Sequence, residues 1–341
     1  MTRVLQAMAG ARHGGAEAFF ERLAPAFSRA GVVQRVVIRR EPARAALLRA
    51  HGIEPVELDF GGAFDFTTRP ALRREIAAFA PDVVLSWMSR AARAVPKGDF
   101  VHVGRLGGYY DLKYYGGCDH LIGNTEDIRD WIVAQGWPRE RVHYVPNFVD
   151  AEPQPVAERA RHATPQDAPL LLALGRLHEN KAFDVLIDAL ARVPGAHLWI
   201  AGEGPLDGVL KTRAQRAGVA ERVHFLGWRR DAPALLAAAD VLVCPSRAEP
   251  LGNVVIEGWA HGRPVVAAAA KGPAALIADG RTGLLAPVDD AAALAQAINR
   301  VLGDRHLRES LASEGRKEYE ASFTERAVVA RYLDFFRRVT A

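Results

Sequence analysis

Two glutamates stand eight positions apart in a stretch that also contains basic and glycine residues. The stretch is PSRAEPLGNVVIE (245–257), with Glu249 and Glu257 as its carboxylates. We expect Glu249 in a loop and Glu257 about one turn into a helix that begins near Gly252. Helix-start amides attract anions, and carboxylates can bind sugar or ribose hydroxyls. Two glutamates at this spacing also fit a solvated helix face, but Gly258-Trp259-Ala260 and the apolar helix around Glu257 are compatible with a buried, functional carboxylate.

A basic pair stands upstream, after an apolar run over 170–174. Gly175 and Arg176 follow that run, and Lys181 opens the next helical pattern. A glycine lets the backbone approach a ligand, while Arg and Lys five positions apart could hold a diphosphate between a planar fork and a point charge. On its own, the pair fits an exposed loop equally well.

A glycine-rich turn, AGEGP (201–205), follows the next apolar run. Such a turn is a purely structural strand-to-helix connection at least as often as it is a binding site. The complete G-x-G-x-x-G pattern of dinucleotide-binding proteins is absent, which argues against a dehydrogenase.

Short apolar runs alternate with helical spacing along most of the chain and would position these residues. This alternation predicts an α/β fold built on doubly wound parallel sheets. The proline-rich segment 151–168 interrupts the alternation and is expected to be a linker. We therefore predict a domain over 1–150, a second over 169–323, and a C-terminal helix over 324–341 that packs back toward the first domain.

Composition excludes several classes of protein. The 341 residues are 49% hydrophobic and 25% charged, typical of a globular chain, and no apolar run approaches the ~20 residues of a membrane span. No signal peptide is recognised, and two distant cysteines, Cys118 and Cys244, argue against a disulfide framework or a zinc cage. A cytoplasmic location is expected. Nucleic acid is not expected as a partner, because the arginines are not interleaved with aromatic residues.

Several segments, in this order and spacing, resemble glycosyltransferase family 4. They are GRLHENKAFDVLIDAL (175–190), AGEGP (201–205), HFLGW (224–228), ADVLVCPSRAEPLGNVVIEGWAHGRPVVA (239–267) and DGRTGLLAPVDD (279–290). HGGAEAFFERLA (13–24) and VPNFVD (145–150) extend the likeness. The segment RLGGYYDLKYYGGCDHLIGNTEDI (105–128) is similar to enzymes of lipopolysaccharide or other cell-surface glycan assembly.

The resemblance implies a GT-B fold, in which two Rossmann-like domains face a cleft, the first binding the acceptor and the second the nucleotide-sugar. It implies retaining transfer of a sugar, from a UDP-sugar by family default, to a glycan or lipid-linked acceptor in lipopolysaccharide-type biosynthesis. No metal or other cofactor is expected, and the absence of any Asp-x-Asp sequence fits this.

Residue roles follow from the matching positions. Arg176 and Lys181 match the basic pair on the donor diphosphate, Glu249 the contact to the transferred sugar, and Glu257 the ribose contact. The remaining expected donor contacts are Gly14, Gly15, Gly175, Gly202, Gly227, Gly252, Asn253 and Val254. His102 is a further catalytic candidate, although the family places its histidine after the strand and His102 lies inside it. Arg105 or the turn 107–109 could occupy that place, and His102 would then be a core residue.

Two other functions compete with sugar transfer: a sugar-nucleotide epimerase of similar architecture, and a non-catalytic nucleotide-sugar-binding protein. A location hypothesis rests on the basic residues in 35–49 and 69–74, since residues 1–150 carry 20 basic and 17 acidic side chains. These arginines could give weak contact with the anionic inner face of the membrane, or they could solvate helices or hold a phosphorylated soluble sugar.

Overall fold

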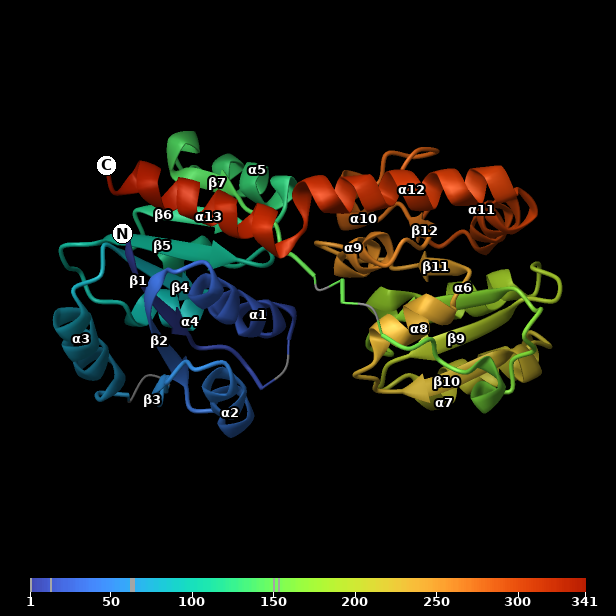
Figure 1. Ribbon diagram of the computed structural model, residues 1–341, viewed down its shortest axis with the longest axis horizontal. Helices are drawn as coiled ribbons and strands as arrows, with labels where there is room; N and C mark the ends of the chain where they lie inside the picture. Colours follow the sequence, from blue (N-terminus) through green and yellow to red (C-terminus); the bar gives the residue numbers. More distant parts are fainter. Residues whose placement is uncertain (1, 13, 62–64, 150, 153) are drawn as a thin grey trace. The chain divides into compact units, whose positions relative to one another are not determined.

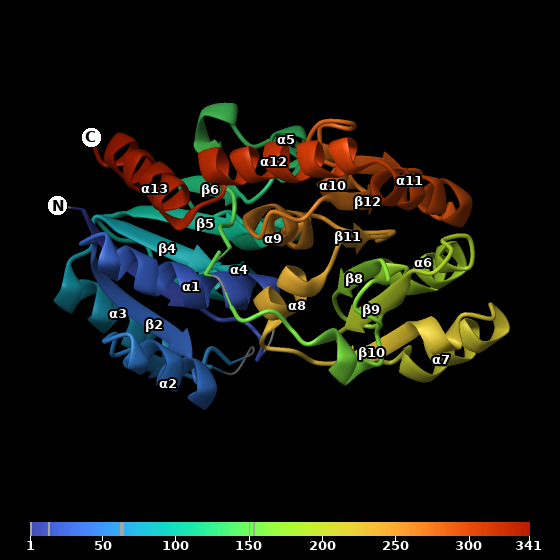
Figure 2. The same cartoon turned by 45° about the vertical axis from the view of Figure 1, so that its right-hand side comes forward.

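The computed structural model describes residues 2–12, 14–61, 65–149, 151–152 and 154–341. The chain forms two compact units, drawn in Figures 1 and 2. Unit 1 comprises residues 1–148 and 325–341, and unit 2 comprises residues 149–324. The predicted α/β class with two parallel-sheet domains is confirmed.

Within the described residues, unit 1 contains a seven-stranded parallel sheet of order β3-β2-β1-β4-β5-β6-β7. Its strands are β1 (Arg3–Met8), β2 (Val33–Arg39), β3 (Val56–Leu58), β4 (Val83–Trp87), β5 (Val101–Leu106), β6 (His120–Gly123) and β7 (Val142–Tyr144). Its α-helices are α1 (Gly15–Arg29), α2 (Pro42–Ala50), α3 (Thr68–Phe79), α4 (Met88–Ala94), α5 (Glu126–Ala134) and α13 (Glu325–Val339).

Unit 2 contains, within its described residues, a six-stranded parallel sheet of order β10-β9-β8-β11-β12-β13. Its strands are β8 (Leu170–Leu174), β9 (His197–Ala201), β10 (Val223–Gly227), β11 (Val241–Cys244), β12 (Val265–Ala268) and β13 (Leu284–Ala286). Its α-helices are α6 (Phe183–Leu190), α7 (Asp207–Arg216), α8 (Ala232–Ala238), α9 (Asn253–Ala260), α10 (Lys271–Leu276), α11 (Ala291–Gly303) and α12 (Arg305–Ser322).

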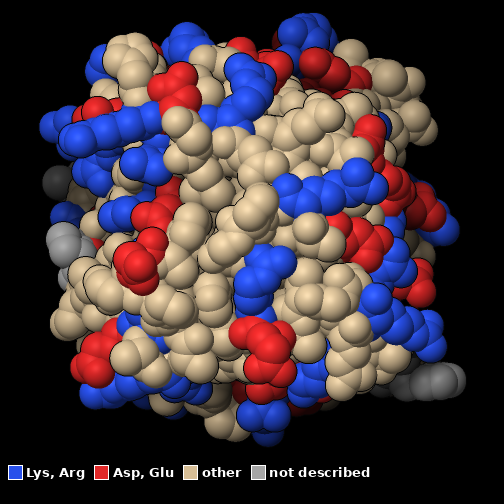
Figure 3. All heavy atoms as spheres, turned by 90° about the vertical axis from the view of Figure 1, so that its right-hand side faces the viewer, with Lys and Arg blue, Asp and Glu red and all other residues tan. Residues whose placement is uncertain are grey.

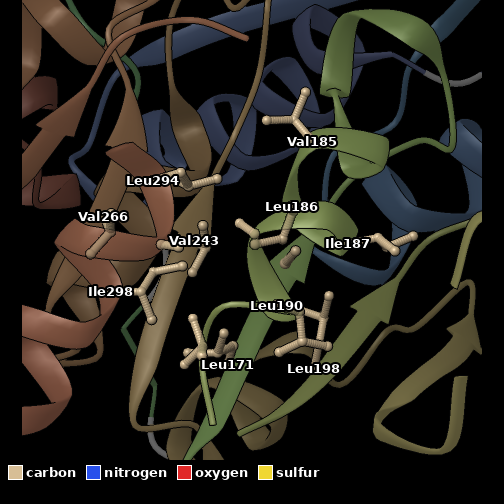
Figure 4. Packing of buried hydrophobic residues seen from close by; sticks show 14 of the residues in the cluster. Leu171, Val185, Leu186, Ile187, Leu190, Leu198, Val243, Val266, Leu294 and Ile298 are labelled. Carbon is tan, nitrogen blue, oxygen red and sulfur yellow. The ribbon is translucent and has the colours of Figure 1, made fainter. Parts of the chain in front are cut away.

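Continuous apolar strands explain both sheets. A parallel sheet covered on both faces buries every side chain, so its strands read as unbroken runs such as Leu170–Leu174. Figure 4 shows one side of the unit 2 core, where Leu186 and Leu190 of α6 pack near strand residues and near Ile298 of α11. On the face shown in Figure 3, basic and acidic side chains are interspersed.

The last helix, α13, belongs to unit 1. Tyr332 and Phe336 on its inner face make edge-on ring contacts with Phe27 of α1. Among the described residues, no helix is both long and apolar enough to cross a bilayer.

The segment 151–168, expected to be a linker, is part of unit 2 and contains a short 3-10 helix, η3 (Arg159–His162). The guanidinium of Arg159 donates to the Ala238 carbonyl at 2.7 Å and to the Asp240 carboxylate at 3.0 Å. It also donates to the Ala168 carbonyl at 2.8 Å. These bonds attach the segment to the chain around α8, so its proline content marks irregular structure rather than a free connection.

Candidate functional site

Loops at the carboxyl ends of the unit 2 strands hold one another through backbone hydrogen bonds. The Gly175 amide donates to the Ala201 carbonyl at 3.0 Å, and the Gly202 amide donates to the Gly227 carbonyl at 2.8 Å. Three glycines expected at the donor thus lie on one edge of the sheet. Ligands of open parallel sheets bind at this edge, near the point where strand order reverses, which here lies between β8 and β11.

Gly202 is the position where this contact requires glycine. Its φ is +155°, and a Cβ built there would lie 1.8 Å from the Gly175 carbonyl oxygen. Any side chain would therefore separate the loops after β8 and β9. The turn AGEGP has at least this structural role.

The structure brings Lys181 and Glu249 together, although 68 residues separate them. Lys181 ends the 3-10 turn η4 (Glu179–Lys181), and Glu249 lies in the loop between β11 and α9. The Lys181 ammonium donates to Oε2 of Glu249, while Oε1 accepts from the Gly252 amide at 3.2 Å. The two side chains are 23% and 12% exposed. Both carboxylate oxygens are thus oriented within a partly buried ion pair.

Electrostatics keep Lys181 protonated. Burial by itself lowers the pKa of this lysine, but the charge and hydrogen bond of Glu249 outweigh it, with a further contribution from Glu257, so the pKa lies above its usual value. Glu257 is half-buried on α9 rather than fully buried. Its negative charge adds a small contribution that raises the pKa of Lys181, after the larger one of Glu249.

The other residues of unit 2 that the sequence predicts at the donor are Arg176 and those at the start of α9. Arg176 is exposed and makes no ion pair with any residue in the described ranges. Gly252, with φ +80°, is the N-cap of α9, and Asn253 and Val254 are its first two residues. A cation and a helix start therefore accompany the Lys181–Glu249 pair in the same unit.

Trp228 and Glu203 were missed by sequence reasoning. Trp228 is 67% exposed directly after Gly227, and its amide donates to Glu203 Oε1 at 3.2 Å. An exposed tryptophan at the end of a parallel strand is unusual, since this side chain is mostly buried. The available signal was the Gly-Trp pair at the end of HFLGW. The sequence around a single aromatic residue does not show whether that residue is exposed or buried.

In unit 1, Gly14 and Gly15 stand at the start of α1. Glu17, in the first turn of this helix, is buried and accepts a hydrogen bond from the Ala11 amide at 2.7 Å. A Cβ at Gly14 would lie 2.3 Å from Oε2 of Glu17. The carboxylate therefore holds the turn before the helix, a role that sequence reasoning missed. An acidic residue two positions after a Gly-Gly helix start was the available signal.

His102, a catalytic candidate from the sequence, is a buried residue of β5. Its Nδ1 lies 3.0 Å from the Gly117 carbonyl oxygen and its Nε2 lies 2.9 Å from Ser86 Oγ. A carbonyl can only accept, so Nδ1 carries the proton and Nε2 accepts. Burial lowers the pKa of this histidine. Both ring nitrogens serve the fold, and we include His102 in no catalytic step.

Arg105, the alternative to His102, is buried as well. Its guanidinium lies between the rings of Phe19 and Trp87, 4.6 and 4.7 Å from their centroids. Its Nε donates to the Tyr332 hydroxyl at 2.7 Å, which attaches α13 to the sheet. This arginine is therefore part of the core of unit 1. Among the described residues, no group of three or more His, Cys, Asp or Glu could hold a metal ion.

Comparisons with known proteins assign both halves of the chain to families. Residues 13–153 match the model described as Glycosyltransferase Family 4, and residues 168–304 match Glycosyl transferases group 1. The lipopolysaccharide core biosynthesis glycosyltransferases LpsE and LpsD of Rhizobium meliloti strain 1021 are 37% and 35% identical to the chain. These alignments cover 94% and 96% of this chain, and 95% and 96% of the relatives.

A solved structure of similar fold is Anabaena HepE in complex with UDP and glucose. Its TM-score is 0.84 at 21% identity, and the match covers 99% of this chain and 100% of that one. At this identity the likeness shows the fold alone. The resemblance inferred from the sequence is confirmed: the chain is a glycosyltransferase with the GT-B fold and belongs to glycosyltransferase family 4.

Proposed function

We propose that the protein transfers a sugar from a UDP-sugar to a glycan or lipid-linked acceptor of lipopolysaccharide core type, with retention of configuration and without a metal. The observation that carries the proposal is the Lys181–Glu249 pair at the carboxyl ends of β8 and β11, beside the start of α9. The names of LpsE and LpsD support the acceptor class, and the UDP and glucose bound by HepE support the donor.

The chemistry needs positive charge where the nucleoside diphosphate leaves. Lys181 is held protonated, and Arg176 carries a permanent charge in the loop after β8. Both cations would stabilise the negative charge that develops on the departing phosphate, together with amides at the start of α9. The reaction then needs no strong base, and we assign no covalent nucleophile. Retention requires the acceptor to attack on the face that the leaving group departs.

Glu249 and Glu257 would orient the donor. The carboxylate of Glu249 can accept hydrogen bonds from hydroxyls of the transferred sugar, and Glu257 can accept them from the ribose. A bound diphosphate would compete with Glu249 for Lys181. The carboxylate could then exchange the ammonium for sugar hydroxyls, so that one donor molecule engages both partners of the ion pair.

The first experiment is a thermal-shift screen with UDP-, GDP- and ADP-sugars, because a ligand that binds the folded state raises its melting temperature. Donors that bind are then incubated with deacylated lipopolysaccharide core, and the anomeric configuration of the product is read by NMR. Sugar appearing on the acceptor with the donor's configuration, with or without EDTA, supports the proposal. Turnover of the donor to an isomeric sugar without acceptor would instead indicate an epimerase. Binding without turnover would indicate a non-catalytic protein.

We also propose weak contact with the anionic inner face of the membrane, through a narrower set of arginines than the sequence suggested. Most basic side chains in 35–49 have carboxylate partners: Arg35 with Glu75, Arg40 with Asp59, Arg44 with Glu21, and Arg49 with Glu54 and Glu57. The candidates for lipid contact are therefore the arginines at 39, 69, 73 and 74, which have no ion pair within the described ranges. Each could contribute about 1 kcal/mol near an anionic surface.

Vesicle co-sedimentation tests this contact. We expect the protein to sediment with anionic vesicles at low salt, to stay in the supernatant with neutral vesicles, and to be released by about 0.5 M salt. The triple variant R69Q/R73Q/R74Q should lose sedimentation, and the matched variant R35Q, whose arginine is paired with Glu75, should keep it. Absence of the protein from the anionic pellet at low salt would exclude the contact.

A further inference from the structure

Arg247 has no role in the site described above, yet its side chain makes several polar contacts. It lies in the loop between β11 and α9, two residues before Glu249. Its Nη1 and Nη2 donate to the two carboxylate oxygens of Asp184, at 3.0 and 2.7 Å, and its Nε forms an ion pair with Asp289. Nη1 also donates to the Glu179 carbonyl at 3.0 Å. All three nitrogens of the guanidinium are thus engaged.

These contacts join three separate segments of unit 2. Asp184 is in the first turn of α6, Glu179 opens η4, and Asp289 lies in the loop between β13 and α11. The main chain adds to the connection, because the Arg247 amide donates to the Asn180 carbonyl at 2.8 Å. A planar fork with fixed directions can hold such a set of partners, and a lysine ammonium cannot.

The segments that Arg247 joins carry unfavourable backbone conformations. Ala182, between Lys181 and α6, has φ +50°, and Asp289 has φ +62°. Left-handed conformations of residues other than glycine cost free energy and persist where surrounding contacts impose them. Arg247 contacts residues on both sides of the Lys181–Ala182 step, Glu179 and Asp184. It is therefore placed to hold the backbone from which the Lys181 side chain extends.

We propose that Arg247 is a positioning residue for sugar transfer: it ties the η4 turn that carries Lys181 to the loop that carries Glu249, and so sets how these two side chains meet at the donor. Arg247 forms no hydrogen bond or ion pair with the ammonium of Lys181 or the carboxylate of Glu249, and it acts through the backbone. The inference rests on the proposed function where it concerns catalysis, and on the contacts alone where it concerns the ion pair.

The chain contains a matched control. Arg213 of α7 donates from Nε to Asp188 at 2.8 Å and also pairs through Nη2, so it forms the same kind of bidentate pair on α6, one turn after Asp184. Removing Arg213 deletes an Arg–Asp pair from the same helix without touching the loop of Glu249. Variants R247A, R247K and D184N are therefore compared with R213A and D188N.

Two measurements test the proposal. In R247A we expect kcat to fall about 10- to 100-fold with the KM for donor changed less than about threefold, because displacement of a catalytic group by about 1 Å has effects of this size. R247K should recover only part of the loss, D184N should resemble R247A, and R213A and D188N should stay within twofold of the unaltered protein.

The second measurement does not depend on activity. The pKa of Lys181 is obtained from its rate of acetylation by acetic anhydride between pH 8 and 11, read by mass spectrometry. We expect R247A and D184N to lower this pKa toward its usual value, because the ammonium loses its fixed contact with Glu249, and R213A to leave it unchanged. An unchanged pKa in folded R247A and D184N, or a kcat for R247A within twofold of R213A, would overturn the proposal. If the unaltered protein transfers no sugar, the proposed function fails, and the acetylation result still decides whether Arg247 positions the ion pair.

Discussion

Replacing Lys181 by methionine separates the two roles of this residue, in folding and in catalysis. The substitution removes the charge but keeps most of the side-chain length, so Glu249 remains as a carboxylate without its ammonium partner, at 12% exposure. Breaking a fully buried ion pair costs about 3–5 kcal/mol, and exposed pairs contribute less than about 1 kcal/mol. Since the two side chains here are 23% and 12% exposed, we expect a loss of about 2 kcal/mol.

That loss is large enough to measure. In a unit of this size, 1 kcal/mol corresponds to about 2–4 °C, so the melting temperature of unit 2 should fall by about 4–8 °C. Adding Glu249→Gln to Lys181→Met removes the unpaired charge, and most of the lost stability should return. Sugar transfer should not return: we expect a fall of about 10²- to 10³-fold in turnover for Lys181→Met, and a value at least as low for the double variant.

Scanning calorimetry and donor turnover, measured on the single and double variants, provide the test. Glu249→Gln alone should bind UDP as well as, or more tightly than, the unaltered protein, because the diphosphate no longer competes with a carboxylate for Lys181. If the double variant melts no higher than Lys181→Met, the two residues are not coupled in folding and the ion pair is wrongly assigned. If Lys181→Met keeps turnover within about fivefold, its charge does not stabilise the leaving group.

Three further outcomes are expected. Arg176→Ala should lower turnover about 10²-fold while the melting temperature changes by less than about 1 °C, because the side chain is exposed and unpaired within the described residues; a drop in melting temperature like that of Lys181→Met would contradict this. Glu257→Ala should weaken nucleoside diphosphate binding about tenfold by calorimetry, with turnover at saturating donor within threefold; unchanged affinity would remove Glu257 from the ribose. Burial lowers the pKa of His143 to about 4 from 6.5, so this residue stabilises the fold above about pH 6.5 and that stability is lost as the pH falls toward 4. In His143→Gln the melting temperature should fall less over this interval, and an equal fall would show that His143 does not titrate as assigned.

The strands of both sheets could be predicted from the sequence, because a parallel strand that is buried on both faces is a short, continuous apolar run. The run Leu170–Leu174 reads as a strand whatever its neighbours, and the helical spacing after it identifies α6. The attachment of segment 151–168 to unit 2 could not be predicted in this way, because its prolines are typical of a linker. The contacts that attach it involve Ala238 and Asp240, about 80 residues away from Arg159. The sequence near Arg159 cannot predict hydrogen bonds to groups so far away along the chain.

The candidate site also contains residues that could be predicted from the sequence and residues that could not. Lys181 and Glu249 could be predicted because they match the basic pair and the first glutamate of the family's motifs, and the structure brings them together in the loops after β8 and β11. His102 was a catalytic candidate because the family places a histidine after this strand, although His102 lies inside it. Its partners, Ser86 and the Gly117 carbonyl, are contributed by neighbouring elements and occupy both ring nitrogens. Residue type predicts what chemistry a side chain can do, and only packing shows whether its polar atoms are available.

The Lys181–Glu249 pair also bears on how a glycosyltransferase could manage without a divalent ion. A metal would add positive charge that is present before the donor arrives, whereas this pair contributes opposite charges that largely cancel. Under the proposed mechanism, a diphosphate takes up the ammonium and releases the carboxylate, so the positive charge of Lys181 adds to that of Arg176 only as the donor brings negative charge. The same exchange turns Glu249 toward sugar hydroxyls. Binding of phosphate and of sugar would then be coupled through one ion pair, and the Glu249→Gln variant, which keeps the cation and loses the exchange, should bind UDP normally yet discriminate less between donor sugars.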